Sequence, residues 1–208
     1  MCKLPVKPSK EECAMDAITL SFKNVAGFSD DEFYQFCLDN VDLKLERTAT
    51  GQIIIMPNTG GKTGDLNSEL NFQLRGWNKQ YLLGKVFDSS TAFLLPSGAV
   101  RSPDAAWVRR DHWDSLTEEQ KTKFPPLCPD FVIELRSESD SLNEVIKKIT
   151  DEWLANGCRL AWLIDPKEEK TYVFESGREM EVISGFNQTL TAADLLPGFA
   201  LDLTQLQS

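Results

Sequence analysis

Histidine is nearly absent from this 208-residue chain, because His112 is the only one. A metal site with several histidines is therefore excluded, and a catalytic triad that needs histidine would have to use that residue. The five cysteines are odd in number, widely scattered and without a Cys-X-X-Cys pair, so neither a disulfide framework nor a zinc knuckle is indicated. Any metal in this protein should be bound by oxygen ligands.

Long hydrophobic runs are also missing. No apolar run approaches the roughly 18 to 20 residues that span a bilayer, and residues 1–13 lack the apolar core of a signal peptide. We therefore expect no membrane association and a cytoplasmic location. Hydrophobic residues make up 41% of the chain, which is enough for a substantial core. We expect a flexible lead over residues 1–17 and a single domain over residues 18–208.

Basic residues are fewer than acidic ones, with 22 Lys and Arg against 32 Asp and Glu and a formal net charge of -10. Affinity for a phosphate backbone comes from accumulated Lys and Arg. The charge therefore argues against indiscriminate binding of nucleic acid, and any contact with it should be confined to a local site.

Apolar periodicity predicts helices and strands in a mixed order. A capping box at Ser29 and Glu32 starts a short helix over 29–40, and alternation over 42–47 and 52–56 indicates a hairpin. Longer amphipathic helices are expected at 65–83 and 140–157, the second ending at Gly157. Seven strands are expected, at 84–90, 91–96, 103–108, 131–136, 159–165, 170–176 and 178–184.

A polar stretch over 109–130 interrupts these strands and is expected to be a surface excursion with one or two helical turns. The remaining order, in which strands alternate with two long helices, is typical of a mixed α/β sheet flanked by helices.

Two acidic residues lie in or beside β-forming runs, where a carboxylate is costly to bury without a partner. Asp104 precedes the run 105–108, and Glu134 lies inside the run 131–136. In the helix that follows, Lys148 lies about 115° from the centre of the apolar face and Lys147 about 145°. Lys148 is therefore the better placed of the two to reach back over the end of the strand.

Two carboxylates on neighbouring strands with a lysine nearby would make a site for a hard cation such as Mg²⁺, which takes oxygen ligands and keeps several waters. Structural explanations stay open for the same residues. Side chains alternate along a strand, so Glu134 shares a face with Arg136 and the two could form an ion pair. Lys148 could be a solvated helix residue, and Asp104 a turn residue.

Two further residues have ordinary explanations. Glu46 could face water on the first hairpin, and His112 lies in a polar stretch typical of the surface.

Four segments together resemble a known family: "DLKLERTATGQIIIMPNTGG", "VFDSSTAFLLPSGAVRSPDAAWV", "CPDFVIELRSESDSLNEVIKKITDEWLANGCRLAWLIDP" and "LPGFALDL". They resemble the Uma-two (Uma2) family of "putative restriction endonucleases" in the PD-(D/E)XK nuclease superfamily. The resemblance extends from about Phe28 to Leu203, and the combination of motifs is specific although each alone is weak. It implies a restriction-endonuclease-like core, a mixed sheet between helices with a metal site at one edge.

The resemblance also implies roles for individual residues. Asp104 matches the aspartate of the PD motif and Glu134 the acid of the second motif, so both are expected as metal ligands. Arg136 stands where the superfamily pattern has lysine, and arginine is a poor proton shuttle because it is effectively always charged. Related members are thought to supply the lysine from the next helix, where Lys148 matches.

A third acid is expected near these residues. Glu46, in the first hairpin, matches a recurrent glutamate of the family. Glu69, on the helix over 65–83, is a rival for that place because many superfamily members carry a glutamate on their first core helix.

These expectations lead to a hypothesis and two alternatives. The hypothesis is a Mg²⁺-dependent deoxyribonuclease, with Mn²⁺ as a possible substitute, that hydrolyses DNA phosphodiester bonds. The first alternative is a non-catalytic binding or regulatory domain with a nuclease fold, and the second a metal-dependent hydrolase of a small phosphorylated substrate. A homodimer is expected on general grounds only, since symmetric dimers are the commonest oligomers.

Overall fold

The computed structural model describes residues 17–21, 27–192 and 194–207. All but the last residue of the expected flexible lead, 1–17, lies outside the described residues. In the part of the chain that is described, no helix is both long and apolar enough to cross a membrane.

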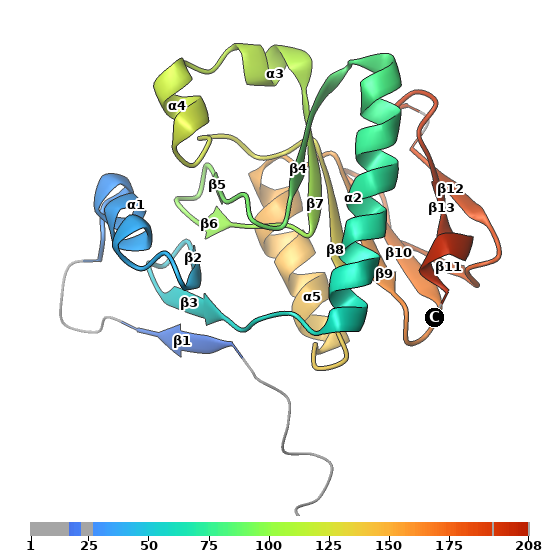
Figure 1. Ribbon diagram of the computed structural model, residues 1–208, viewed down its shortest axis with the longest axis horizontal. Helices are drawn as coiled ribbons and strands as arrows, with labels where there is room; N and C mark the ends of the chain where they lie inside the picture. The colour runs from blue at the N-terminus through green and yellow to red at the C-terminus, as the bar shows by residue number, and fades with distance from the viewer. Residues whose placement is uncertain (1–16, 22–26, 193, 208) are drawn as a thin grey trace, which may run out of the picture.

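A six-stranded mixed sheet forms the centre of the molecule (Figure 1). Its strands, in spatial order, are β11 (Glu181–Ser184), β10 (Lys170–Glu175), β9 (Leu160–Asp165), β8 (Phe131–Leu135), β7 (Ala105–Arg109) and β4 (Gly84–Asp88). Strands β8 and β9 run parallel, while the other neighbours are antiparallel. The mixed α/β fold expected from the sequence is therefore confirmed.

Two helices cover opposite faces of this sheet. Helix α2 (Gly61–Tyr81) packs through Leu66, Leu70 and Leu74 against the face that carries Ile133. Helix α5 (Leu142–Lys148) and the turns after it pack against the face that carries Val132. Because side chains alternate along β8, Glu134 shares the face of Val132 and points to the side of α5.

The segment after α5 departs from the single helix expected over 140–157. The α-helix ends at Lys148 and continues as a π-helical turn, η1 (Ile149–Trp153), and a 3₁₀ turn, η2 (Leu154–Asn156). Gly157 ends it with φ of 106°, as expected for a glycine that stops a helix. Single π turns are frequent at functional sites, and this one carries Trp153, whose indole contacts Glu134.

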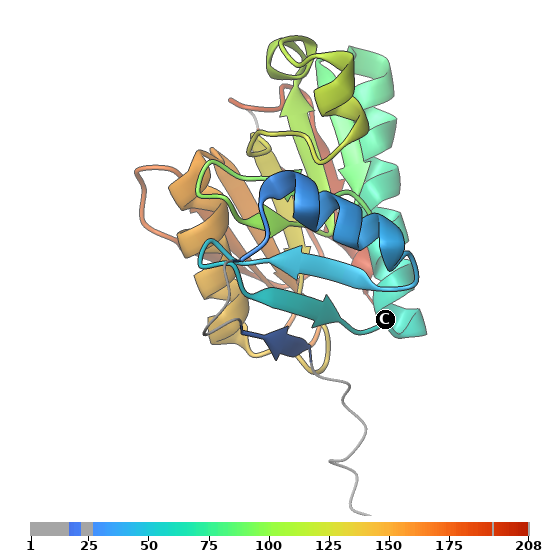
Figure 2. The ribbon, with the colours of Figure 1, turned by 90° about the vertical axis from the view of Figure 1, so that its left-hand side faces the viewer.

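The N-terminal part adds a smaller sheet with the order β1-β3-β2-β6-β5 (Figure 2). Its strands are β1 (Ile18–Leu20), β2 (Lys44–Arg47), β3 (Ile53–Met56), β5 (Phe93–Leu94) and β6 (Val100–Arg101). The antiparallel pairing of β2 with β3 confirms the predicted hairpin. Strand β2 also pairs with β6 through Arg47 and Val100, which brings Glu46 close to the segment before Asp104.

The other elements surround these two sheets. Helix α1 (Asp30–Asp39) begins with the predicted capping box of Ser29 and Glu32. Short helices α3 (Arg110–Asp114) and α4 (Glu118–Thr122) form the predicted excursion. At the C-terminal end, β12 (Thr189–Thr191) pairs with β13 (Ala200–Asp202), which is followed by η3 (Leu203–Leu206).

Candidate active site

Asp104 lies directly before β7, at the end of the sheet where β8 finishes. The antiparallel register pairs Ala105 with Ile133, so Asp104 is level with the last residues of β8. Its Oδ2 accepts a hydrogen bond from the backbone N of Leu135 at 2.8 Å, and its Oδ1 accepts one from Asn67 Nδ2 at 3.1 Å. Asn71 Nδ2 donates to the backbone oxygen of Asp104 at 3.0 Å. This hydrogen bond links Asp104 to α2.

Glu134 is buried beneath α5, with 5% of its surface exposed. Its Oε1 accepts a hydrogen bond from Trp153 Nε1 at 2.6 Å and lies 2.9 Å from Lys148 Nζ. Burial raises the pKa of the Glu134 carboxyl to about 7, and the charge of Asp104 adds to this, although Lys148 opposes it. The effect of the Asp104 charge on Glu134 indicates that the two carboxyls lie in one electrostatic environment.

Lys148 reaches back over the end of β8, as the helical spacing predicted. Its Nζ donates to the backbone oxygen of Ser102 at 3.2 Å and lies 4.0 Å from Glu46 Oε1. Burial alone would lower the pKa of the ammonium, but Glu134 and Glu46 outweigh it and hold the pKa above its ordinary value. Lys148 is therefore charged at neutral pH, and its role in chemistry stays a prediction.

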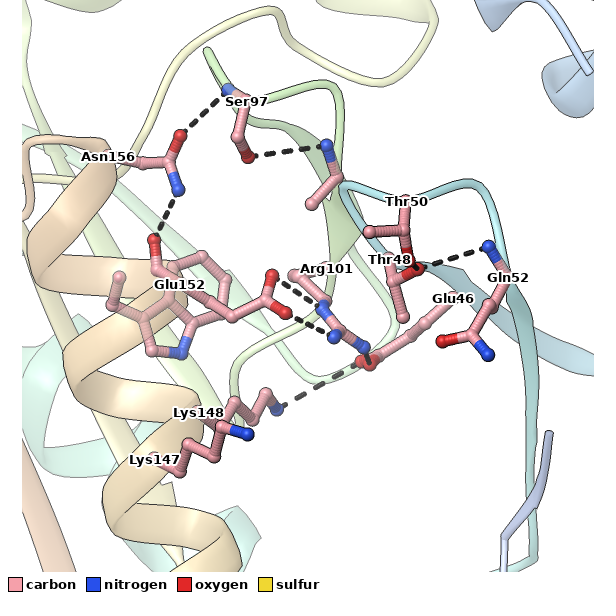
Figure 3. A network of polar contacts seen from close by, with 12 residues as sticks. Glu46, Thr48, Thr50, Gln52, Ser97, Arg101, Lys147, Lys148, Glu152 and Asn156 are labelled. Carbon is pink, nitrogen blue, oxygen red and sulfur yellow. Dashed lines mark hydrogen bonds and ion pairs between the residues drawn. The ribbon is translucent and has the colours of Figure 1, made fainter. Parts of the chain in front are cut away.

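Glu46 is buried, with 2% of its surface exposed, so the expectation that it faces water is wrong. Its Oε1 accepts a hydrogen bond from the backbone N of Ser102 at 3.1 Å, and its Oε2 lies 2.9 Å from an Arg101 nitrogen. Burial would raise the pKa of this carboxyl, but Lys148 and Arg101 lower it below the ordinary range. In Figure 3, Lys148 and Arg101 both point to the carboxylate of Glu46.

Arg101 and Glu152 belong to this cluster, although neither was predicted from the sequence. Arg101 Nε donates to Glu152 Oε2 at 2.9 Å, and a second guanidinium nitrogen contacts the other carboxylate oxygen (Figure 3). A signal was present in each case. Arg101 stands three residues before Asp104, and Glu152 stands four residues after Lys148, a spacing that puts two helical side chains on one face.

The side chains of this cluster carry an excess of negative charge. Four carboxylates face two cationic groups, which leaves a formal charge of -2 when all are ionised; they are Glu46, Asp104, Glu134 and Glu152 with Arg101 and Lys148. Buried charge of one sign is costly without a counterion. A divalent cation would balance it, so the residues present fit an oxygen-bound metal in charge and donor type.

The protein would not enclose such an ion by itself. Among residues 17–21, 27–192 and 194–207, no group of three or more His, Cys, Asp or Glu side chains is placed to hold a metal. Mg²⁺ is usually bound by one or two carboxylates, with waters and substrate phosphates in the other positions. Asp104 and Glu134 suit that kind of site.

The expected pair of Glu134 with Arg136 is wrong. Arg136 lies just beyond the end of β8, and its guanidinium is 2.6 Å from Asp165 Oδ2. The parallel register pairs Leu135 with Ile164, which puts Asp165 beside Arg136 on the neighbouring strand. Asp165 is fully buried, and Arg136 neutralises its charge.

Glu69 does not approach Asp104. Its Oε1 accepts a hydrogen bond from Gln73 at 2.9 Å, and Gln73 in turn contacts Asp202. Two residues along a helix are separated by about 200°, so Glu69 and Asn67 lie on nearly opposite sides of α2. Of the two rival glutamates, the structure brings Glu46 to the cluster.

Comparisons with known proteins agree with this architecture. Residues 30–204 match the family model Uma2, described as "Putative restriction endonuclease". The fold is similar to the crystal structure of "a putative nuclease belonging to DUF820" from Anabaena variabilis ATCC 29413. That similarity has a TM-score of 0.66 and 23% sequence identity, and it covers 85% of this chain and 95% of the other. No curated protein matches the sequence.

Proposed function

Since the chain belongs to the Uma2 family, we propose that it is a Mg²⁺-dependent endonuclease that hydrolyses DNA phosphodiester bonds at the cluster around Glu134. One observation carries the proposal: Lys148 Nζ lies 2.9 Å from Glu134 Oε1 and 4.0 Å from Glu46 Oε1, at the end of the sheet where Asp104 also lies. Two acids and an ammonium, on strands β8 and β2 and helix α5, thus meet at the end of the sheet beside Asp104.

Asp104 and Glu134 would hold the metal. When bound, Mg²⁺ supplies a Lewis acid for the phosphate and acidifies a water molecule. Both oxygens of Asp104 already accept a hydrogen bond, from Asn67 and from the backbone of Leu135, which fixes the carboxylate without using all of its lone pairs. Asp104 is therefore held in place and still has lone pairs for a metal ligand bond.

Lys148 would stabilise negative charge rather than take a proton. Its raised pKa keeps it protonated near neutral pH, so it is a poor general base. As a fixed cation beside the metal ligands it can neutralise charge that develops on the phosphate. Glu46, which contacts Arg101 and lies near Lys148, acts as a positioning residue for the ammonium.

Arg136 has no part in this proposal, although it stands where the superfamily pattern has lysine. Its guanidinium neutralises buried Asp165 and donates to the backbone oxygen of Asp140 at 3.1 Å. Both contacts are within the protein, so its function is structural.

The experiment is a cleavage assay on supercoiled plasmid and single-stranded DNA with Mg²⁺ or Mn²⁺. We expect cleavage by the unmodified protein and loss of it in Glu134→Gln, because the substitution removes a metal ligand charge at constant size. Glu144→Gln is the matched control, since Glu144 is an exposed glutamate on α5, the helix that covers Glu134.

Two results would contradict the proposal. Cleavage that survives unchanged in Glu134→Gln would exclude this cluster as the active site. No cleavage by the unmodified protein, together with no binding of Mg²⁺ or Mn²⁺ in calorimetry, would favour the alternative of a non-catalytic domain.

A further inference from the structure

The side-chain amide of Asn67 contacts the candidate metal site from α2, on the other side of the sheet from α5. Its Nδ2 donates to Asp104 Oδ1 at 3.1 Å. Its Oδ1 is buried, and no donor among the described residues reaches it. A buried acceptor without a donor costs free energy, so an unsatisfied oxygen beside a carboxylate needs an explanation.

We propose that Asn67 is a third oxygen ligand of the cation that Asp104 and Glu134 hold, an inference that rests on the proposed function. Amide oxygens are ordinary ligands of hard cations. An amide also adds no charge, so it would complete the ligand set without adding to the excess of negative charge in the cluster.

The observed separation suits this role. Two adjacent ligands of an octahedral ion with bonds of about 2.1 Å lie about 3.0 Å apart. Asn67 Nδ2 and Asp104 Oδ1 are 3.1 Å apart. A half-turn of the amide would put its Oδ1 in the place of Nδ2, at about the same separation.

The Asn67 amide presents its N–H to Asp104, because two oxygens at this separation repel each other unless a cation lies between them. A cation between the two residues would reverse that preference and use the oxygen that is now without a partner. The amide is thus expected to have one orientation without metal and the other with it.

The position of Asn67 on its helix supports the same conclusion. Glu69, the acid expected on this helix from family resemblance, is turned away and contacts Gln73. Asn67 and Asn71 are four residues apart and therefore lie on one face, and both contact Asp104. Asn71 donates to the backbone oxygens of Asp104 and Asn67 and to neither side chain, which makes it a matched control.

The first measurement is the affinity of the full chain for Mn²⁺ by calorimetry, without DNA. We expect Asn67→Leu to weaken binding about 10- to 100-fold, the range seen when residues that support a metal site are changed. Asn71→Leu should weaken it less, because that side chain only helps to hold the backbone at Asp104 and Asn67.

The second measurement separates a ligand from a hydrogen-bond donor. Asn67→Asp keeps an oxygen but loses the N–H. A ligand role predicts binding at least as tight as in the unmodified protein, and a role confined to the N–H predicts weaker binding. Pulsed electron paramagnetic resonance of bound Mn²⁺, in unmodified protein with ¹³C in its asparagine amides, should show coupling to a directly ligating amide. This readout does not depend on the folding of any variant.

The results distinguish the inference from the function on which it rests. If the unmodified protein binds Mn²⁺ but Asn67→Leu binds it equally well, or no short-range ¹³C coupling is seen, the role of Asn67 is excluded and the metal site stands. If the unmodified protein binds no Mn²⁺, the proposed function and this inference both fail.

Discussion

The dipeptide Pro-Asp occurs twice, at Asp104 and at Asp130, and the two aspartates lie at opposite ends of the same pair of strands. Asp104 precedes β7 and Asp130 precedes β8, and these strands are antiparallel. Asp130 Oδ2 accepts hydrogen bonds from the backbone N of Arg109 at 2.9 Å and from His112 Nδ1 at 3.1 Å. The two aspartates share the dipeptide Pro-Asp, but different residues contact their side chains.

The surroundings give the two aspartates different roles. Asp130 is buried, and its side-chain contacts are with the start of α3, so it fixes the end of a strand. Asp104 has buried acids and Lys148 nearby, in a cluster with excess negative charge. Donors satisfy both aspartates, so hydrogen bonding does not separate them. An acid beside a strand is a candidate ligand when other buried acids lie near it, as they do near Asp104.

The largest expected effect is on cleavage. Asp104→Asn should lower the rate of Mg²⁺-dependent DNA cleavage about 10²- to 10³-fold, comparable to removing one electrostatic contact to a transition state. Asp130→Asn should leave the rate unchanged, because Asp130 lies at the other end of the strands. Initial rates measured well below the unfolding temperature test this, and equal losses in the two variants would break the comparison.

Lys148→Met should have the next largest effect, on stability. Glu134 is buried and Lys148 is its cationic partner, so removing the ammonium should cost about 3–5 kcal/mol of unfolding free energy, because a buried carboxylate is left without a counter-charge. Lys147→Met, on the exposed neighbour, should change stability by no more than about 0.5 kcal/mol. Urea unfolding at pH 8 with a chelator checks both variants. A small loss of unfolding free energy in Lys148→Met would show that buried Glu134 does not need the ammonium of Lys148.

The two aspartates should also differ in stability without metal. Asp130→Asn should cost about 1–3 kcal/mol, since it disturbs a buried carboxylate that accepts hydrogen bonds. Asp104→Asn should cost less, because the loss of an acceptor for Leu135 or Asn67 is offset by the removal of one negative charge from a cluster that has an excess of them. Thermal unfolding with a chelator tests the difference. A destabilised Asp104→Asn with an unaffected Asp130→Asn would reverse the assignment.

The smallest expected effect is on the pH dependence of stability. The pKa of Glu134 is raised from 4.5 to about 7 in the folded protein. Between these values the folded state binds more protons than the unfolded chain, so the contribution of Glu134 to stability falls as pH rises through this window. In thermal unfolding with a chelator, the stability of Glu134→Gln should decrease less from pH 5 to pH 7.5 than that of the unmodified protein. An unchanged decrease would assign it to another group.

Local pattern was sufficient for most of the fold. The capping box at Ser29, the apolar face of α2 and the stop at Gly157 each depend on neighbours within a few residues, and all three are found in the structure. Alternation along β8 likewise indicated which face Glu134 occupies, and helical spacing selected Lys148 over Lys147.

Contacts between distant segments could not be predicted in the same way. Arg101 meets Glu46 across 55 residues of sequence, and Arg136 meets Asp165 across 29. Each contact depends on the register between strands, and a shift of one residue would turn the side chain to the other face. The π turn at Ile149–Trp153 was also missed, because the apolar spacing over this stretch fits a regular helix.

The sequence by itself determined an acidic α/β protein in which one strand carries a buried acid and the next helix a lysine on the matching side. Only the tertiary structure decided that Glu46, Arg101 and Glu152 join them, that Arg136 serves Asp165, and that Asn67 rather than Glu69 faces Asp104. The reason is physical. Periodicity gives the direction of a side chain relative to its own element, whereas the charge that it meets depends on which elements are packed beside it.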